Sequence, residues 1–110
     1  MNIQIFAKSK CFDSKKAERW FKERRIKYQL VDIRRVGLSR GELQSVKNAV
    51  GLAAMIDEKH PDAATLRYLA YDEDRLEKLF EEPERLKTPI VRNGRQATVG
   101  YCPEVWEKWV

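Results

Sequence analysis

The sequence of 110 residues has little cysteine or histidine and no long apolar run, and each shortage excludes a class of protein. Two cysteines, Cys11 and Cys102, cannot form the disulfide framework that stabilises small secreted domains. They are also too few for a cysteine-only zinc site, and the single histidine, His60, does not complete one, so we expect no metal. No segment approaches the roughly 18 uninterrupted apolar residues of a membrane span. With no charged leader at the start, we expect a cytoplasmic protein that makes no membrane contact.

The remaining composition supports one folded domain, with 43% hydrophobic and 35% charged residues. The net charge of +5 is unevenly distributed along the chain. The first 40 residues carry twelve Lys or Arg and four Asp or Glu, whereas residues 41–86 carry six and eleven. This pattern indicates two structural regions or an anionic substrate or partner near the termini, and a mixed, solvated surface is the alternative.

The hydrophobic pattern predicts the order of the elements. Residues 2–7 and 28–33 are expected to be parallel strands joined by a helix from Ser14 to Arg25, which makes a right-handed β-α-β unit. An acidic, all-helical segment follows, with helices over 39–50, 63–70 and 73–82; Ser39 and Glu42 have the spacing of a capping box. Residues 89–92 and 96–101 then form a hairpin around Asn93-Gly94. A last helix starts at Pro103.

This order predicts an α/β fold with a thioredoxin-like, mixed four-stranded sheet and a helical insertion. We expect a single domain over 1–110, with the thioredoxin-fold core in 1–36 and 87–110 and the insertion in 37–86. Trp20, Trp106 and Trp109 stand at helical spacing with other apolar residues and are expected to pack in the core.

Cys11 is the candidate nucleophile because it stands between the first strand and the first helix. Free N–H groups at a helix start favour negative charge, and Lys8, Lys10, Lys15 and Lys16 add positive charge nearby. Both effects favour the thiolate, which is the reactive form of cysteine. The alternative is a small buried residue that happens to be cysteine.

Three further positions accompany Cys11. Ser14 either caps the helix or stabilises the thiolate, and because it is not cysteine no disulfide can form within residues 11–14. Thr88-Pro89 opens the third strand, and we expect a cis bond there, beside the nucleophile. Cys102 is expected at the same end of the sheet, either as a thiol that resolves an intermediate on Cys11 or as a buried residue at a helix start.

Together these segments resemble the arsenate reductase–Spx (ArsC-like) family: Ile5-Phe6, Cys11-x-x-Ser14, Tyr28 to Asp32, Thr88-Pro89-Ile90-Val91 and Val99-Gly100-Tyr101. The resemblance covers nearly the whole chain. It implies that Cys11 attacks the substrate and that glutathione, as co-substrate, and glutaredoxin complete a reduction. Cys-x-x-Ser is similar to the arsenate-reducing branch, whose members hold arsenate with three arginines.

The first of these arginines comes from the helical insertion, where this chain offers Lys59 or, less well placed, Arg67. The second directly precedes the proline of the third strand, where this chain has Thr88, with Lys87 one place earlier. The third precedes the proline of the last helix, where this chain has Cys102. Threonine and cysteine do not replace a bidentate arginine, so arsenate is not the expected substrate. We expect a thiol-dependent reductase with Cys11 and Ser14 as catalytic residues, which acts on a small thiol or oxyanion substrate. Its substrate groove is expected to include Lys10, Lys15, Lys59, Thr88 and Pro89.

The alternative is a regulator. The Spx branch binds the RNA polymerase alpha subunit, commonly carries Cys-x-x-Cys, and is similar to this chain at Gly100-Tyr101. The basic N-terminal third is consistent with such a docking role. We expect no direct nucleic-acid binding, because the chain has no recognised motif and no exposed aromatics interleaved with its positive charge.

Overall fold

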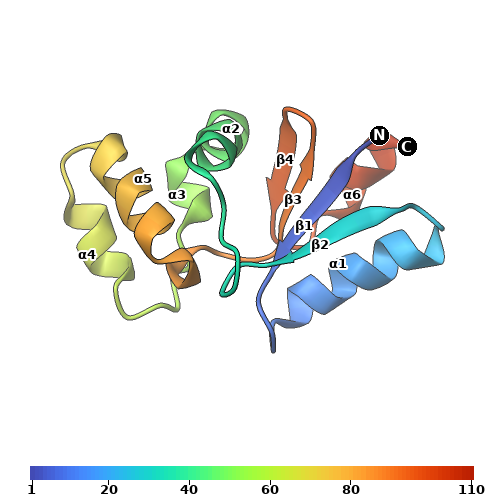
Figure 1. The fold of residues 1–110 in the computed structure, drawn as a ribbon, viewed down its shortest axis with the longest axis horizontal. Helices are drawn as coiled ribbons and strands as arrows, with labels where there is room; N and C mark the ends of the chain where they lie inside the picture. The colour runs from blue at the N-terminus through green and yellow to red at the C-terminus, as the bar shows by residue number, and fades with distance from the viewer.

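The computed structural model describes all residues from Met1 to Val110 and contains one four-stranded mixed sheet. The strand order is β2-β1-β3-β4, with β1 parallel to β2 and antiparallel to β3, and β3 antiparallel to β4 (Figure 1). This arrangement confirms the predicted thioredoxin-like α/β fold. The strands are β1 (Ile3–Ala7), β2 (Tyr28–Asp32), β3 (Ile90–Asn93) and β4 (Gln96–Val99).

One face of the sheet is covered by α1 (Phe12–Glu23) and α6 (Pro103–Trp106), with a short 3-10 turn, η2 (Glu107–Trp109), after α6. Trp20 and Trp106 meet edge to face beneath the sheet, with ring centroids 5.4 Å apart. The indole N–H of Trp106 donates to Thr98 Oγ1 at 2.8 Å, which satisfies its buried polar atom. Both tryptophans are buried, as the sequence predicts, and Trp109 packs half-buried against this cluster.

The other face is covered by the helical segment, which shares a larger hydrophobic cluster with the sheet. Both hydrogen bonds of the predicted capping box form at the start of α2: Ser39 Oγ accepts from the Glu42 N–H, and Glu42 Oε1 accepts from the Ser39 N–H. The elements of this segment are α2 (Arg40–Val50), α3 (Leu52–Met55), α4 (Ala63–Tyr68), α5 (Asp72–Glu81) and the 3-10 turn η1 (Pro83–Arg85).

The structure corrects several predicted details. The segment is not purely helical, because Ile56 and Leu86 form an isolated antiparallel bridge. Helix α3 was not predicted, since four residues are too short to show a helical period. Helix α1 begins at Phe12 instead of Ser14, and β4 ends at Val99 because Gly100 turns the chain with φ +89°.

The molecule is elongated, with principal extents of 42 × 27 × 23 Å. Figure 1 shows the helical segment on one side of the sheet and α1 and α6 on the other, with the connection from β1 to α1 at the lower edge. None of the helices has the length and hydropathy that crossing a membrane requires.

Candidate active site

A tight turn places Cys11 at the start of α1. The Cys11 N–H donates to the Lys8 carbonyl at 3.4 Å, and Lys10 takes the left-handed conformation with φ +66° to close this turn. Cys11 is the N-cap of α1, and its carbonyl accepts from the Lys15 N–H at 3.2 Å. The thiol therefore stands where the first amide groups of a twelve-residue helix have no partner within the helix.

Two hydroxyl groups face the Cys11 thiol. Thr88 Oγ1 donates to Cys11 Sγ at 3.2 Å, and the Cys11 S–H reaches the Thr88 carbonyl at 3.7 Å. The Thr88–Pro89 bond is cis, as predicted, and both residues are buried. Ser14 is only 2% exposed, and its Oγ makes no well-formed hydrogen bond in the resting geometry. The Ser14 hydroxyl is therefore available to the thiolate.

These neighbours lower the pKa of the Cys11 thiol. Partial burial alone would raise this pKa, but the Ser14 and Thr88 hydroxyls and the backbone N–H groups of Ser14 and Asp13 together lower it. Hydrogen bonds to the charged form favour ionisation, so the thiolate is stabilised mainly by aligned donors. The lysines invoked from the sequence are not among these main contributors.

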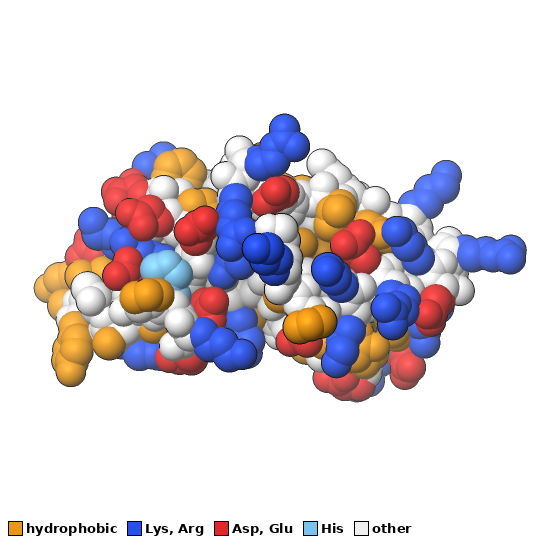
Figure 2. All heavy atoms as spheres, turned by 90° about the horizontal axis from the view of Figure 1, so that it is seen from below, with side chains coloured by type: hydrophobic (Ala, Val, Ile, Leu, Met, Phe, Trp, Pro, Cys, Tyr) orange, Lys and Arg blue, Asp and Glu red, His pale blue; other side chains and the backbone are white.

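Cys11 opens into a cavity of about 590 Å³ between the sheet and the helical segment. Figure 2 shows lysine and arginine side chains gathered in the middle of this face of the molecule. The cavity is lined by five cations, Lys8, Lys10, Arg34, Lys59 and Lys87, and by three carboxylates, Asp13, Asp57 and Glu84. Anionic ligands suit this excess of positive charge.

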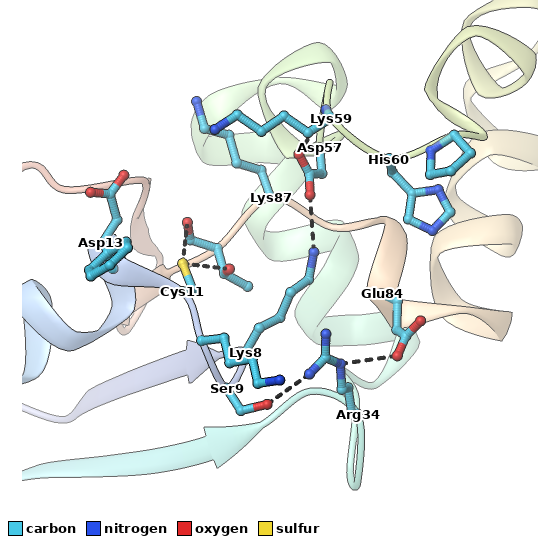
Figure 3. A pocket seen from close by; sticks show the side chains of 14 residues that line it. Lys8, Ser9, Cys11, Asp13, Arg34, Asp57, Lys59, His60, Glu84 and Lys87 are labelled. Carbon is cyan, nitrogen blue, oxygen red and sulfur yellow. Dashed lines mark hydrogen bonds and ion pairs between the residues drawn. The ribbon is translucent and has the colours of Figure 1, made fainter.

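Two of the five cations are already paired (Figure 3). Lys8 Nζ lies 3.3 Å from Asp57 Oδ2, and Arg34 Nε lies 3.0 Å from Glu84 Oε1. Arg34 also donates to Ser9 Oγ at 2.7 Å. Burial would raise the pKa of Asp57, but the Lys59 backbone N–H and the Lys8 ammonium lower it, so Asp57 stays ionised.

The other three cations, Lys10, Lys59 and Lys87, line the cavity without an ion-pair partner. They are the lysines that remain free to contact a bound anion.

The structure brings together most of the predicted site residues. Cys11, Lys10, Lys59 and Thr88 line one cavity, and Ser14 lies beneath the thiol. Pro89 is buried behind Thr88 and does not line the cavity.

Lys15 is placed elsewhere, on the exposed side of α1 beside Glu18, Arg19 and Lys22. The capping alternative for Ser14 is wrong, because Cys11 is the N-cap and Ser14 belongs to the first turn.

Sequence analysis missed three charged residues of the cavity, Arg34, Asp57 and Glu84. They come from loops and turns far apart in the chain, and no local pattern marks them. His60, which the sequence did not assign to the site, also lines the cavity, where its Nδ1 accepts from the Asp62 N–H at 3.0 Å. Nowhere in the chain do three His, Cys, Asp or Glu residues converge to hold a metal ion.

Cys102 is the N-cap of α6 and is not bonded to Cys11. Its thiol is half-buried, donates to the Val99 carbonyl at 3.4 Å and does not line the cavity. Burial, followed by the Glu104 carboxylate, raises the pKa of this thiol, against a lowering effect of Lys87. Pairing between the two cysteines stays a prediction.

Comparison with known proteins agrees with this fold. The global transcriptional regulator Spx 2 of Oceanobacillus iheyensis is 33% identical over 107 residues, which are 92% of this chain and 78% of that protein. The arsenate reductase from Vibrio cholerae superposes with a TM-score of 0.85 at 23% identity, covering 100% of this chain and 98% of that one. An ArsC family related protein from Bacteroides fragilis gives the same TM-score and identity over 100% of both chains. The model of the ArsC family matches residues 6–109, so this chain belongs to the ArsC family.

Proposed function

We propose that this protein is a thiol-dependent reductase in which Cys11 is the single residue that attacks the substrate. The observation that carries the proposal is a thiol with a lowered pKa, at a helix start, open to a cavity rich in lysine. The thiolate is the attacking form in thiol–disulfide exchange, and its formation at neutral pH is favoured by a lowered pKa.

The substrate class that suits the cavity is a small anionic disulfide, such as a mixed disulfide of glutathione. Lys10, Lys59 and Lys87 are free to contact its carboxylates. A tetrahedral oxyanion such as arsenate suits the site less well. The only guanidinium in the cavity, Arg34, is already engaged by Glu84 and Ser9. Glutathione is thus the preferred co-substrate.

The reaction proceeds through two exchanges. The Cys11 thiolate attacks the glutathione sulfur of the mixed disulfide, forms a Cys11–glutathione disulfide and expels the other sulfur as a thiolate, which takes a proton from water. A second glutathione thiolate, or a glutaredoxin-like thiol protein, then attacks the glutathione sulfur and releases Cys11 as a thiolate. The two electrons come from glutathione, and Thr88 and Ser14 stabilise the sulfur each time it leaves.

The test is alkylation of both cysteines by iodoacetamide over a range of pH, followed by peptide mass analysis. Cys11 should react with a midpoint below the ordinary thiol pKa of about 8.5, and Cys102 with a midpoint above it. A Cys11 midpoint at or above the ordinary value would exclude the proposal. Turnover of a glutathione mixed disulfide with excess glutathione gives the second readout.

The second candidate function is a regulator that docks on the RNA polymerase alpha subunit. Its support is the 33% identity to a protein named as a global transcriptional regulator, together with the basic N-terminal third. In this role the fold serves as a docking surface, and Cys11→Ser should bind as well as the unmodified chain. A pull-down with the alpha C-terminal domain tests it, and no binding at micromolar protein would remove this candidate.

A further inference from the structure

The second thiol, Cys102, has no role in the exchange described above, yet the fold brings its segment beside the nucleophile. Cys102 stands between β4 and α6, three residues after the end of β4. Its Sγ hydrogen bond to the Val99 carbonyl, at 3.4 Å, is the only one that the thiol donates. This contact is weak, because sulfur is a poor donor. Cys102 also packs against the hydrophobic cluster that contains Trp106, so a movement of the thiol would break one weak hydrogen bond and part of this packing.

A short chain of contacts connects the two cysteines. Thr88 Oγ1 donates to Cys11 Sγ at 3.2 Å, and the next residue, Pro89, accepts from the Gly100 N–H at 2.8 Å. Cys102 follows Gly100 by two residues. Cys11 and Cys102 therefore flank the same segment, Thr88-Pro89, at the same end of the sheet.

Charged groups of the Cys11 cavity also act on Cys102. Asp13 and Lys87 both line that cavity. Lys87 lowers the pKa of Cys102, whereas Asp13 raises it. Charges act strongly only over short distances in water and salt. Together with the hydrogen bond from Gly100 to Pro89, this places Cys102 within the electrostatic range of groups that line the Cys11 cavity, although Cys102 does not line the cavity itself.

We propose that Cys102 is the resolving thiol for a mixed disulfide on Cys11. This inference rests on the proposed function, since it needs the Cys11–glutathione intermediate. The Cys102 thiolate attacks Cys11 Sγ, a Cys11–Cys102 disulfide forms, and glutathione leaves as a thiolate that takes up the proton lost by Cys102. A dithiol reductant, either a thioredoxin-like protein or dithiothreitol, reopens the bridge by supplying two electrons and two protons.

The two local environments suit this division of roles. Cys102, with its raised pKa, stays protonated in the resting protein and does not compete with Cys11 for the substrate. Cys11, with its lowered pKa, is a good leaving group when a dithiol opens the bridge. Bridging needs Cα atoms within about 7 Å. The segment that would move is Tyr101 and Cys102, which follow the last residue held to Pro89, Gly100, and lie outside the paired part of β4.

The experiment treats the reduced full chain with glutathione disulfide, without free glutathione, and follows intact and peptide masses over time. The unmodified protein should show a short-lived glutathione adduct on Cys11. This adduct should be replaced by a chain that is two hydrogens lighter than the reduced protein, and digestion of that chain should give a disulfide-linked pair of peptides that contain Cys11 and Cys102. Cys102→Ser should stop at the adduct, which should persist at least about tenfold longer. Loss of the adduct in the unmodified protein should accelerate as pH rises.

Cys102→Ala repeats the test with no polar atom at this position, and thermal unfolding of both variants checks that they fold. An adduct that persists equally in the unmodified protein and in Cys102→Ser would overturn the resolving role while leaving the nucleophile intact. If neither forms an adduct on Cys11, the proposed function fails and this inference fails with it.

Discussion

The two cysteines stand at equivalent places in two different helices, and their chemistry differs. Each is an N-cap whose side chain makes no capping hydrogen bond, Cys11 at α1 and Cys102 at α6. The pKa of Cys11 is lowered, whereas the pKa of Cys102 is raised. Burial raises both, and it is the largest single influence in each case. The difference must therefore come from other neighbours.

Those neighbours are hydrogen-bond donors at Cys11 and carboxylates at Cys102. Ser14, Thr88 and two backbone N–H groups favour the Cys11 thiolate, while Glu104 and Asp13 oppose a thiolate at Cys102. Helix α6 has only four residues, against twelve in α1, so its start offers a weaker field. A helix start alone does not make a thiol reactive; the groups facing the sulfur decide.

The largest expected effect is loss of the first exchange in Cys11→Ser. With excess glutathione, reduction of a glutathione mixed disulfide should fall to the uncatalysed rate, because serine forms no thiolate. Cys102→Ser should still form the Cys11 adduct and turn over, since free glutathione replaces the second thiol. If the two variants lose the same activity, the contrast between the two sites is not functional.

Next in size is the effect of Thr88→Val, which keeps the shape and removes the hydroxyl that donates to Cys11 Sγ. A hydrogen bond to a charged group contributes about 1.5–3 kcal/mol, so the thiolate fraction at neutral pH should fall about tenfold or more. Alkylation midpoints measure this, and that of Cys102 should stay unchanged. Thr98→Val, which removes the partner of Trp106, serves as a matched control for folding.

Ser14→Ala should separate reactivity from stability. The buried Ser14 hydroxyl has no well-formed hydrogen bond in the resting protein, so its loss should leave the free energy of unfolding unchanged or raise it by about 1 kcal/mol. The pKa of Cys11 should rise at the same time, because one donor to the thiolate is gone. Denaturant unfolding and alkylation of the same sample test both. A clear loss of stability would mean that Ser14 has a structural role.

The smallest expected effects concern the cavity lysines. Lys10→Gln and Lys87→Gln should each raise the KM for an anionic disulfide by about two- to fivefold at low salt, since exposed charge pairs contribute about 0.2–1 kcal/mol. The effect should shrink as salt increases. Lys15→Gln is the matched control, because Lys15 lies outside the cavity. Equal effects at all three positions would indicate long-range attraction instead of contact.

Much of the fold follows from local sequence because its markers act over a few residues. The Ser39–Glu42 capping box and the glycine of the β3–β4 hairpin each specify one connection, although the turn residues are Gly94 and Arg95, one place later than predicted. Apolar spacing locates α1 against the sheet. Helix α3 and the Ile56–Leu86 bridge escape prediction because packing, not local preference, forms them.

The position of the candidate nucleophile could be predicted for the same reason, because the place of Cys11 depends on one strand and one helix. The rest of the cavity depends on tertiary structure. Arg34, Asp57 and Glu84 lie far apart in the chain and meet only when the helical segment packs against the sheet. The causes of the lowered Cys11 pKa were predicted only in part. The N–H groups at the helix start and, as one of two alternatives, the Ser14 hydroxyl follow from local sequence, whereas the Thr88 hydroxyl reaches Cys11 only through the tertiary structure.

In the ion pairs Lys8–Asp57 and Arg34–Glu84, a carboxylate of the protein already occupies each cation, so a negatively charged ligand must compete with that carboxylate to bind the cation. A ligand that recruits either cation must displace a carboxylate that is already there, so binding through these residues is an exchange of partners. Singly charged anions gain little from such an exchange. A molecule that carries two separated negative groups can contact the free lysines before it displaces either carboxylate, so we expect the cavity to favour dianions over singly charged anions.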